Sequence, residues 1–449
     1  MLSRIKTIIQ AGAPRSQTAK KNIILSFANK AVAIIISFAL IPITIDYLNA
    51  EQYGVWLTLS SIVAWLSFFD IGLGHGFRNR FAEAKAKGDI TLARKYVSTT
   101  YLTLFIIFGL VLIVFECVNS FINWASVLNI SQSQNPLLSS VASIILIGVC
   151  TSFTVNVFPI MLSADQKPAA SAMISTIGQA VALLSIYILT LQPIHSMIYI
   201  AIALSWSPVF ITVFVSAWMF THRYRQYAPS FNLVDRTLIK NIINLGVKFF
   251  IIQISMILIF QVVNIILYRV LGPTAVTEYN VTYKYFSITM MVFNIILSPY
   301  WSAFTDAYTK SDYNWMNIVH QKLVKVWLIL TGISILLLCC SSWVYKVWLH
   351  GSIEVQLTTS ISMFIYINVL SFSTMYMILL NGIGKVYLQM IIYLICAIVA
   401  IPSSIYLCDI FGISGILIVL SSVYALQGFL ARIQLNKLLN RGATGIWNK

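Results

Sequence analysis

A lysine and several hydrogen-bonding side chains share one face of the apolar stretch 280–298. Asn280, Lys284, Ser287, Asn294 and Ser298 follow one another at spacings of 4, 3, 7 and 4 residues. At about 100° per residue these positions fall on one side of a helix, and Val, Ile, Phe and Leu occupy the others. Such a face offers a positive charge and several hydrogen bonds, which suits an anionic, polar ligand.

This charged face is costly to place against lipid. The stretch is long enough at about 1.5 Å per residue to cross most of a bilayer. A lysine at the bilayer centre costs about 2.5–3.5 kcal/mol on insertion scales. We therefore expect other helices to build a polar cavity that Lys284 faces. The alternative is that its long side chain reaches the outer headgroups.

Three more basic residues, Lys30, Lys248 and Arg269, interrupt other apolar stretches. Lys30 shares a helix face with Ser37 and Thr44, at seven-residue spacing. The planar guanidinium of Arg269 could clamp a phosphate, because it donates two parallel hydrogen bonds. Anchoring at the membrane interface is the competing interpretation for each of the three.

Charged residues near the ends of apolar stretches are weaker candidates. Arg78 and Arg80 could receive an anionic group at the inner side, or they could simply favour the cytoplasm. Asp46 and Glu116 are the acids best placed to bind a coupling proton or cation. Asp70 is a further coupling-ion candidate, although it could instead pair with one of the arginines or cap a helix.

Composition places the chain in a membrane. Of its 449 residues 59% are hydrophobic and 9% are charged, with a mean hydropathy of +0.85. Soluble domains carry about 25% charged residues. The apolar segments have helical length and do not alternate as barrel strands do, so an all-α polytopic protein is predicted.

Twelve membrane spans are predicted from the apolar segments. They are 22–48, 52–72, 98–120, 138–162, 170–192, 196–219, 246–270, 276–305, 323–347, 355–380, 386–407 and 412–435. With the N-terminus inside, 24 of the 29 Lys and Arg fall in inner segments and none falls in an outer loop. This asymmetry predicts cytoplasmic termini and explains most of the net charge of +16 without nucleic acid.

The spans predict a five-part organisation in which two lobes are joined by a linker. The inner segments 73–97 and 220–245 are expected to form amphipathic helices on the membrane surface. The predicted parts are a cytoplasmic N-terminal segment at 1–21, an N-lobe at 22–219, a cytoplasmic linker at 220–245, a C-lobe at 246–435 and a cytoplasmic tail at 436–449.

The two halves of the chain repeat each other. Phe81-Ala82-Glu83-Ala84-x-x-Lys87-Gly88-Asp89 recurs 223 residues later as Phe304-Thr305-Asp306-Ala307-x-x-Lys310-Ser311-Asp312. Leu162-Ser163-Ala164-x-x-Lys167 recurs 218 residues later as Leu380-Asn381-Gly382-x-x-Lys385. Because each half holds six spans, the lobes should be parallel and related by a pseudo-two-fold axis along the membrane normal. Cavities between such halves are typical of secondary transporters.

Several loose motifs resemble one family of exporters. They are Tyr53-Gly54-Val55-Trp56, Phe69-Asp70-Ile71-Gly72-Leu73-Gly74, Arg78-Asn79-Arg80, the Glu83 to Asp89 segment, Leu271-Gly272 with Tyr279, and Ser298-Pro299 before Phe304. With them, the chain is similar to the O-antigen flippases, in the polysaccharide-export branch of the multidrug/oligosaccharidyl-lipid/polysaccharide (MOP) exporter superfamily.

The resemblance implies two six-helix lobes that form a V and open alternately to either side. It implies movement of undecaprenyl-diphosphate-linked O-antigen or polysaccharide repeat units from the cytoplasmic to the periplasmic leaflet of the bacterial inner membrane. Membrane lipids and a polysaccharide polymerase with its chain-length machinery are the implied partners. A cation-coupled small-molecule or multidrug exporter of the same superfamily is the alternative. The sugars, the driving force, the oligomeric state and the cavity-lining face of the span 246–270 stay open.

An enzyme is the weaker alternative. A membrane-embedded glycan polymerase would present catalytic groups in a sizeable outer loop, and the longest outer loop is predicted at 121–137. The histidines and cysteines lack metal-ligand spacing, and no phosphate-binding loop or paired-carboxylate motif is present. No catalytic residue, metal or cofactor is therefore expected.

Overall fold

The computed structural model describes residues 14–48, 52, 56, 72–127, 131–193, 196–348 and 355–448. All regular secondary structure in these residues is helical. Eleven of the described helical segments are long and apolar enough to cross a membrane. The twelfth predicted span, 52–72, lies outside the described residues except for its ends and Trp56. The all-α membrane fold is therefore confirmed.

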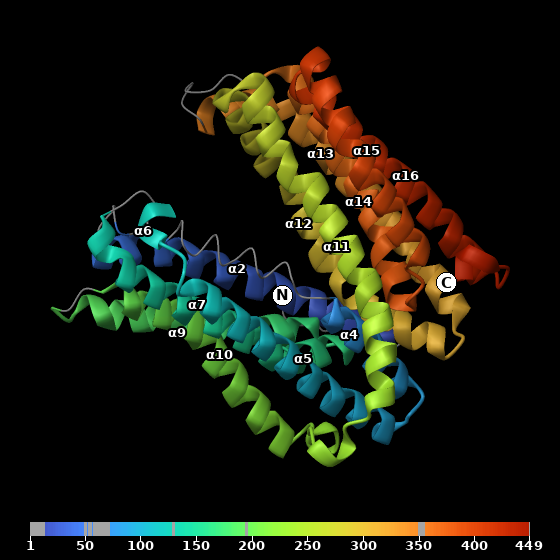
Figure 1. Cartoon of the computed structure of the whole chain (residues 1–449). Helices are drawn as coiled ribbons and strands as arrows, with labels where there is room; N and C mark the ends of the chain where they lie inside the picture. The colour runs from blue at the N-terminus through green and yellow to red at the C-terminus, as the bar shows by residue number, and fades with distance from the viewer. Residues whose placement is uncertain are drawn as a thin grey trace, which may run out of the picture. The chain divides into compact units, whose positions relative to one another are not determined.

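The chain divides into two compact units between Val247 and Lys248. The N-terminal unit runs in Figure 1 from blue to green. Its helices are α2 (Pro14–Leu48), α4 (Leu73–Ala86), α5 (Ile90–Asn119), α6 (Trp124–Val127), α7 (Asn135–Val155), α8 (Val157–Ala164), α9 (Pro168–Thr190) and α10 (Met197–Thr221).

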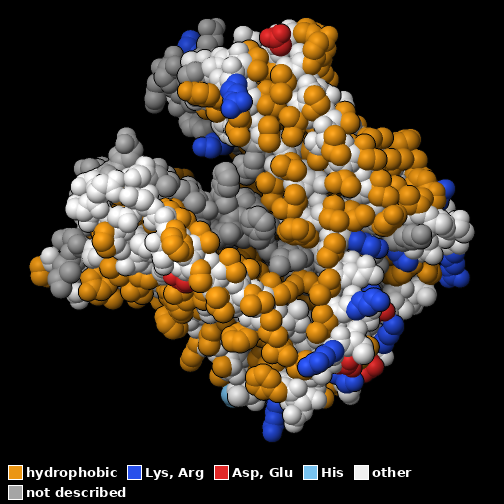
Figure 2. Space-filling view, viewed as in Figure 1, with side chains coloured by type: hydrophobic (Ala, Val, Ile, Leu, Met, Phe, Trp, Pro, Cys, Tyr) orange, Lys and Arg blue, Asp and Glu red, His pale blue; other side chains and the backbone are white. Residues whose placement is uncertain are grey.

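Helix α11 (Arg236–Leu271) begins in the N-terminal unit and continues into the C-terminal unit. The other helices of the C-terminal unit are α12 (Pro273–Thr309), α13 (Tyr313–Trp348), α14 (Leu357–Ile383), α15 (Tyr387–Phe411) and α16 (Ile413–Leu439). Hydrophobic side chains cover broad surfaces of each unit, whereas Lys and Arg appear in smaller patches (Figure 2).

Local sequence explains several helix ends. Asp89 precedes α5 and accepts a hydrogen bond from Leu92 N at 2.8 Å, which satisfies an otherwise unpaired amide. Ser196 caps α10 in the same way. Pro168 opens α9, where its missing N–H costs nothing. Gly384 ends α14 with φ +81°, a left-handed conformation that glycine adopts without steric cost.

The same helix pairs contact each other in both units. In each unit the third span packs on the fourth, which is α5 on α7 and α13 on α14. The sixth span packs on the fourth, which is α10 on α7 and α16 on α14. The sixth span also packs on the fifth, which is α10 on α9 and α16 on α15. Glycines permit close contact: a Cβ on Gly178 would lie 2.6 Å from Pro208 Cα, and one on Gly428 would lie 3.0 Å from Ser373 Cα.

The repeated motifs form the same turns. In 83–89 and 306–312 the lysine pairs with the acid four residues earlier, at 2.7 and 2.8 Å. Segments 162–167 and 380–385 each contain one residue with a left-handed backbone conformation, and the two residues, Gln166 and Gly384, occupy matching positions. The matched backbone bonds are Lys87 N to Glu83 O, Asp89 N to Ala84 O and Lys167 N to Leu162 O in one unit, and Lys310 N to Asp306 O, Asp312 N to Ala307 O and Lys385 N to Leu380 O in the other.

Two expectations about the inner segments are wrong. Segment 220–245 is not one amphipathic helix: two 3-10 turns, Arg225–Tyr227 and Phe231–Leu233, precede the first turns of α11. Pro229 between the turns cannot donate the amide hydrogen bond that a continuous helix needs. Segment 73–97 is not one helix but divides into α4 and the start of α5, and α4 buries Phe77 and Phe81 where it packs on α5 and α8.

Candidate functional site

The predicted cationic face lies on α12. Lys284 and Asn294 are exposed, whereas Phe286 and Phe293 on the other side of the helix are fully buried. The buried side packs on α14, so the core of the C-terminal unit does not use Lys284. Among the described residues no carboxylate pairs with this lysine. Its charge is therefore available to a ligand.

Two members of the predicted stripe have local partners instead. Asn280 is half-buried, and its Nδ2 donates to Asn264 Oδ1 of α11 at 3.0 Å and to Val276 O at 2.7 Å. Ser287 donates to Lys284 O at 3.1 Å. The Asn264 side of α11 thus faces α12. Asn280 joins two helices, and the exposed part of the stripe reduces to Lys284 and Asn294, with Ser287 half-buried between them.

The other basic candidates lie in different surroundings. Lys30 is exposed on α2, and Arg269 is exposed near the end of α11. Lys248 is half-buried, with its Nζ 5.3 Å from the centre of the Tyr387 ring on α15. This geometry is a cation–π contact and gives Lys248 a structural partner.

Arg78 and Arg80 belong to α4. Arg80 Nη1 lies 3.0 Å from Glu83 Oε2, and Glu83 Oε1 lies 2.7 Å from Lys87 Nζ. Burial lowers the pKa of Arg78 to about 9, and burial together with Arg78 lowers the pKa of His75 to about 4. Arg78 is therefore half-buried at the packed end of the unit.

The acidic candidates do not form one site. Asp46 is exposed near the end of α2, and Asp70 lies outside the described residues. Glu116 on α5 accepts a hydrogen bond from Ser143 of α7 at 2.8 Å, and its Oε1 is buried without a described partner. No group of three metal-ligating side chains occurs among the described residues.

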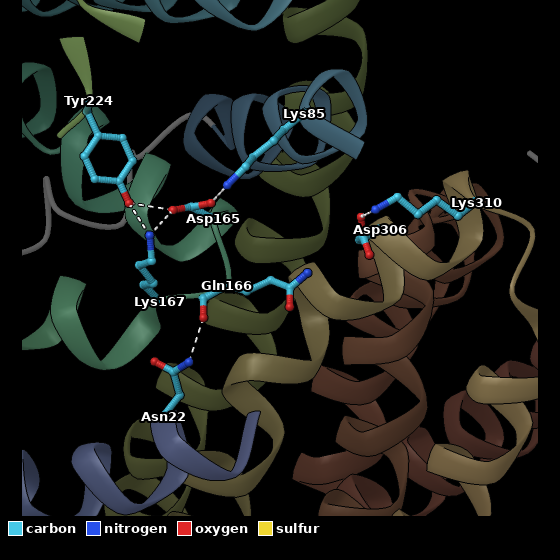
Figure 3. Close-up of polar contacts among 8 residues, drawn as sticks. All are labelled: Asn22, Lys85, Asp165, Gln166, Lys167, Tyr224, Asp306 and Lys310. Carbon is cyan, nitrogen blue, oxygen red and sulfur yellow. Dashed lines mark hydrogen bonds and ion pairs between the residues drawn. The ribbon is translucent and has the colours of Figure 1, made fainter. Parts of the chain in front are cut away.

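A cluster that was not predicted surrounds Asp165, between α8 and α9. This carboxylate is 7% exposed and contacts the ammonium groups of Lys85 and Lys167 (Figure 3). Tyr224 Oη donates to Asp165 Oδ2 at 2.5 Å and accepts from Lys167 Nζ at 2.8 Å. One buried acid therefore links α4, the α8–α9 turn and the residues after α10.

The α2 helix joins the same end of the unit. Asn22 Nδ2 donates to Gln166 O at 2.6 Å and to Thr18 O at 2.9 Å. Burial raises the pKa of Tyr224 to about 12, so its hydroxyl stays protonated and can donate to Asp165. Burial, followed by the nearby Arg223, lowers the pKa of Lys167 to about 8.

The repeat contained a signal for this cluster. Lys85 and Asp165 occupy variable positions inside the repeated motifs, and their counterparts in the second half are Tyr308 and Ile383. There the contact is a side-chain-to-backbone hydrogen bond, in which Thr305 Oγ1 donates to Gly382 O at 2.7 Å. An acid and a base that occur at these positions in only one of the two halves therefore indicate an ion pair across the turn.

Comparison with known proteins identifies related sequences. Residues 19–305 match the family described as polysaccharide biosynthesis protein. A protein of Yersinia pseudotuberculosis named "Putative O-antigen export protein" is 24% identical over 67% of this chain and 68% of its own length. A Salmonella typhimurium protein named "Putative O-antigen transporter" is 22% identical over 90% of this chain and 93% of its own length.

Solved structures of MATE and MOP transporters share the fold. The crystal structure of a MATE mutant has a TM-score of 0.76 at 16% identity, over 96% of this chain and 98% of that chain. The outward-facing conformation of a multidrug resistance MATE transporter of the MOP superfamily has a TM-score of 0.76 at 15% identity, over 97% and 98%. A MOP transporter from Pyrococcus furiosus has a TM-score of 0.69 at 16% identity, over 96% and 98%.

Proposed function

Since the chain belongs to the polysaccharide biosynthesis protein family, we propose that it is a MOP-superfamily transporter that flips lipid-linked glycans. The cargo is an undecaprenyl-diphosphate-linked O-antigen or polysaccharide repeat unit, which moves from the cytoplasmic to the periplasmic leaflet by alternating access. The protein resides in the inner membrane with both termini in the cytoplasm. The two curated relatives, whose names refer to O-antigen, support this cargo.

The exposed Lys284 face of α12 is the observation that carries the proposal. A diphosphate joined to sugars crosses a membrane only where cations and hydrogen-bond donors replace water. Lys284 supplies the charge, and Ser287 and Asn294 on the same helix supply polar groups. A site for cationic drugs would need acidic groups on this face, and its exposed charge is positive.

The remaining candidates are assigned by exposure. Lys30 in the N-terminal unit and Arg269 in the C-terminal unit are each assigned a contact with the headgroup, because each is exposed on a membrane-spanning helix of its own unit. Arg80, Arg78 and Lys248 contribute less directly, since each is half-buried within its own unit. Asn280 supports the site by joining α12 to α11.

A cation-coupled small-molecule exporter is the second candidate. The similarity in fold to a multidrug MATE transporter favours it. So does Glu116, whose Oε1 is buried without a described partner and could take up a proton or cation. Asp46 and Asp70 are weaker candidates for this role. Asp46 is exposed, and Asp70 lies outside the described residues.

Transport in liposomes tests the proposal. The cargo is an undecaprenyl-diphosphate oligosaccharide with a fluorescent label, and external dithionite bleaches only the label on the outer leaflet. We expect Lys284→Ala to slow movement about 10- to 100-fold, because one charge-assisted hydrogen bond contributes about 1.5–3 kcal/mol. Lys284→Arg should retain part of the rate.

The control is Lys322→Ala, which removes an exposed lysine from α13. It should transport at the wild-type rate. Wild-type movement in Lys284→Ala would show that the lysine is a headgroup anchor. A wild-type protein that moves no glycolipid under any imposed gradient, but exports small cations, would establish the second candidate instead.

A further inference from the structure

A groove of about 700 Å³ runs between α2 and α9 in the N-terminal unit. Basic side chains gather at one end, where Lys21, Lys167 and Arg223 line it. Asn22 also lines this end, and its hydrogen bond to Gln166 O brings the start of α2 beside the α8–α9 turn. The groove is thus closed by polar groups at the end from which α9 starts.

The rest of the groove is mainly apolar, and Asn29 and Thr176 are the polar residues that line it there. Its walls are formed on α2 by Leu25, Val32 and Ile36, and on α9 by Met173 and Ile177. Leu25, Val32 and Met173 are each about half exposed, at 49%, 50% and 55%. These side chains leave an open apolar channel along two neighbouring helices.

The charged end has an excess of positive charge. Asp165 is the acid in contact with Lys167, and it is shared with Lys85. Arg223 lies close enough to Lys167 to help lower the pKa of that lysine. Among the described residues neither Lys21 nor Arg223 pairs with a carboxylate. An anion placed here would relieve repulsion between cations.

The length of the apolar part matches one leaflet. It extends over 25–36 on α2 and 169–180 on α9, or about 17 Å along each helix at 1.5 Å per residue. The hydrocarbon core of a bilayer is about 30 Å thick, so one leaflet contributes about 15 Å. A single acyl chain that starts at the charged end would fill the channel.

We propose that this groove binds an anionic phospholipid, with its phosphate between Lys21, Arg223 and Lys167 and one acyl chain along α2 and α9. Basic pockets between membrane helices bind anionic headgroups in this way. We assign a phospholipid rather than the transported glycolipid, because the channel ends after one leaflet. The inference does not depend on the cargo proposed above.

Native mass spectrometry of the full-length protein tests the site. The probes are phosphatidylglycerol and phosphatidylcholine with identical acyl chains, so only the headgroup charge differs. We expect one phosphatidylglycerol to bind more tightly than phosphatidylcholine. In Lys21→Gln/Arg223→Gln its affinity should fall about thirtyfold, because each basic residue near an anionic lipid is worth about fivefold.

Two further variants separate charge from space. Lys322→Gln/Lys325→Gln removes the same net charge from exposed positions of α13 and should bind as wild type. Ala180→Phe fills the apolar end without changing charge and should also weaken binding. The proposal would be overturned if the wild-type protein bound both lipids with equal affinity. It would also be overturned if the α13 control lost as much phosphatidylglycerol affinity as Lys21→Gln/Arg223→Gln. Displacement of phosphatidylglycerol by an equimolar undecaprenyl-diphosphate lipid would assign the groove to the cargo instead.

Discussion

At the scale of residues, the Asp165 side chain joins three segments of the N-terminal unit. It is nearly buried and takes hydrogen bonds or ion pairs from Lys85, Lys167 and Tyr224. A buried carboxylate is tolerated only when such partners compensate for its lost hydration. Removing the charge therefore affects three segments at once.

Asp165→Asn should lower the free energy of unfolding of the N-terminal unit by about 2 kcal/mol. The reason is that two ammonium groups and one hydroxyl lose a charged acceptor, and hydrogen bonds to charged groups contribute about 1.5–3 kcal/mol each. Both lysines are partly exposed, which limits the loss. Thermal unfolding of the purified protein in detergent measures it. Lys87→Gln, which breaks an exposed pair with Glu83, should change the free energy of unfolding by less than about 0.5 kcal/mol. Equal destabilisation by Lys87→Gln and Asp165→Asn would contradict the structural role given to Asp165.

The sequence could reveal only part of the candidate site. Periodicity predicts that Lys284 and Asn294 share one face of a helix, and in the structure both are exposed on α12. It could not show that Asn280 turns toward Asn264, because that depends on how α11 and α12 pack. The role of Asp165 could not be predicted for a similar reason. Its partner Lys85 is 80 residues away in the sequence, and only the fold brings the two side chains together.

At the scale of helices, close packing at glycine determines which pairs contact. Gly382 on α14 faces α12 so closely that a Cβ there would lie 2.3 Å from Trp301 O. Backbone cannot move aside as a flexible side chain can. The contact also lets Thr305 reach Gly382 O, which gives the helices a hydrogen bond without any charged group.

Gly382→Ala should destabilise the C-terminal unit by about 1–3 kcal/mol, the usual cost of overpacking. Gly332→Ala on α13 is the matched control, because nothing lies within 4 Å of its added Cβ. That substitution should leave stability unchanged or raise it by up to about 1 kcal/mol, since alanine favours the helix. Unfolding midpoints of the two variants in the same detergent give the comparison. Equal midpoints would show that the contact at Gly382 tolerates an added methyl group.

Helices were easier to predict than the segments between them. Apolar length alone located eleven of the described spans, because a bilayer forces every backbone group to bond within its helix. Several helices extend well beyond the predicted apolar core; α11, for example, begins at Arg236 rather than 246. The amphipathic composition of 220–245 predicts one helix, but Pro229 lacks the amide hydrogen that a continuous helix needs there.

At the scale of the whole molecule, the distribution of charge governs orientation. Basic residues gather in alternate loops of the sequence, and such loops are retained on the cytoplasmic side during insertion. With the predicted topology, the groove on α2 and α9 would lie in the cytoplasmic leaflet, where anionic lipids attract basic groups. The proposed lipid site and the predicted topology are therefore linked.

Reporter fusions test that topology. Alkaline phosphatase needs disulfides that form outside the cytoplasm, so a fusion after Lys449 should be inactive. A fusion after Gln192, in a predicted outer loop, should be active. Green fluorescent protein at the two positions should give the opposite pattern. Active phosphatase at Lys449 would reverse the predicted orientation and place the basic loops outside.

The matched turns also record how the chain arose. Segments 81–89 and 304–312 share four of nine residues, a similarity that is weak as a sequence. Their acid–lysine pairs and backbone hydrogen bonds nevertheless correspond, and both include a left-handed residue, Gly88 in one and Ser311 in the other. Gene duplication explains this agreement: two copies kept one backbone path while their side chains diverged. The traces of the ancestral half are thus clearer in dihedral angles than in residue types.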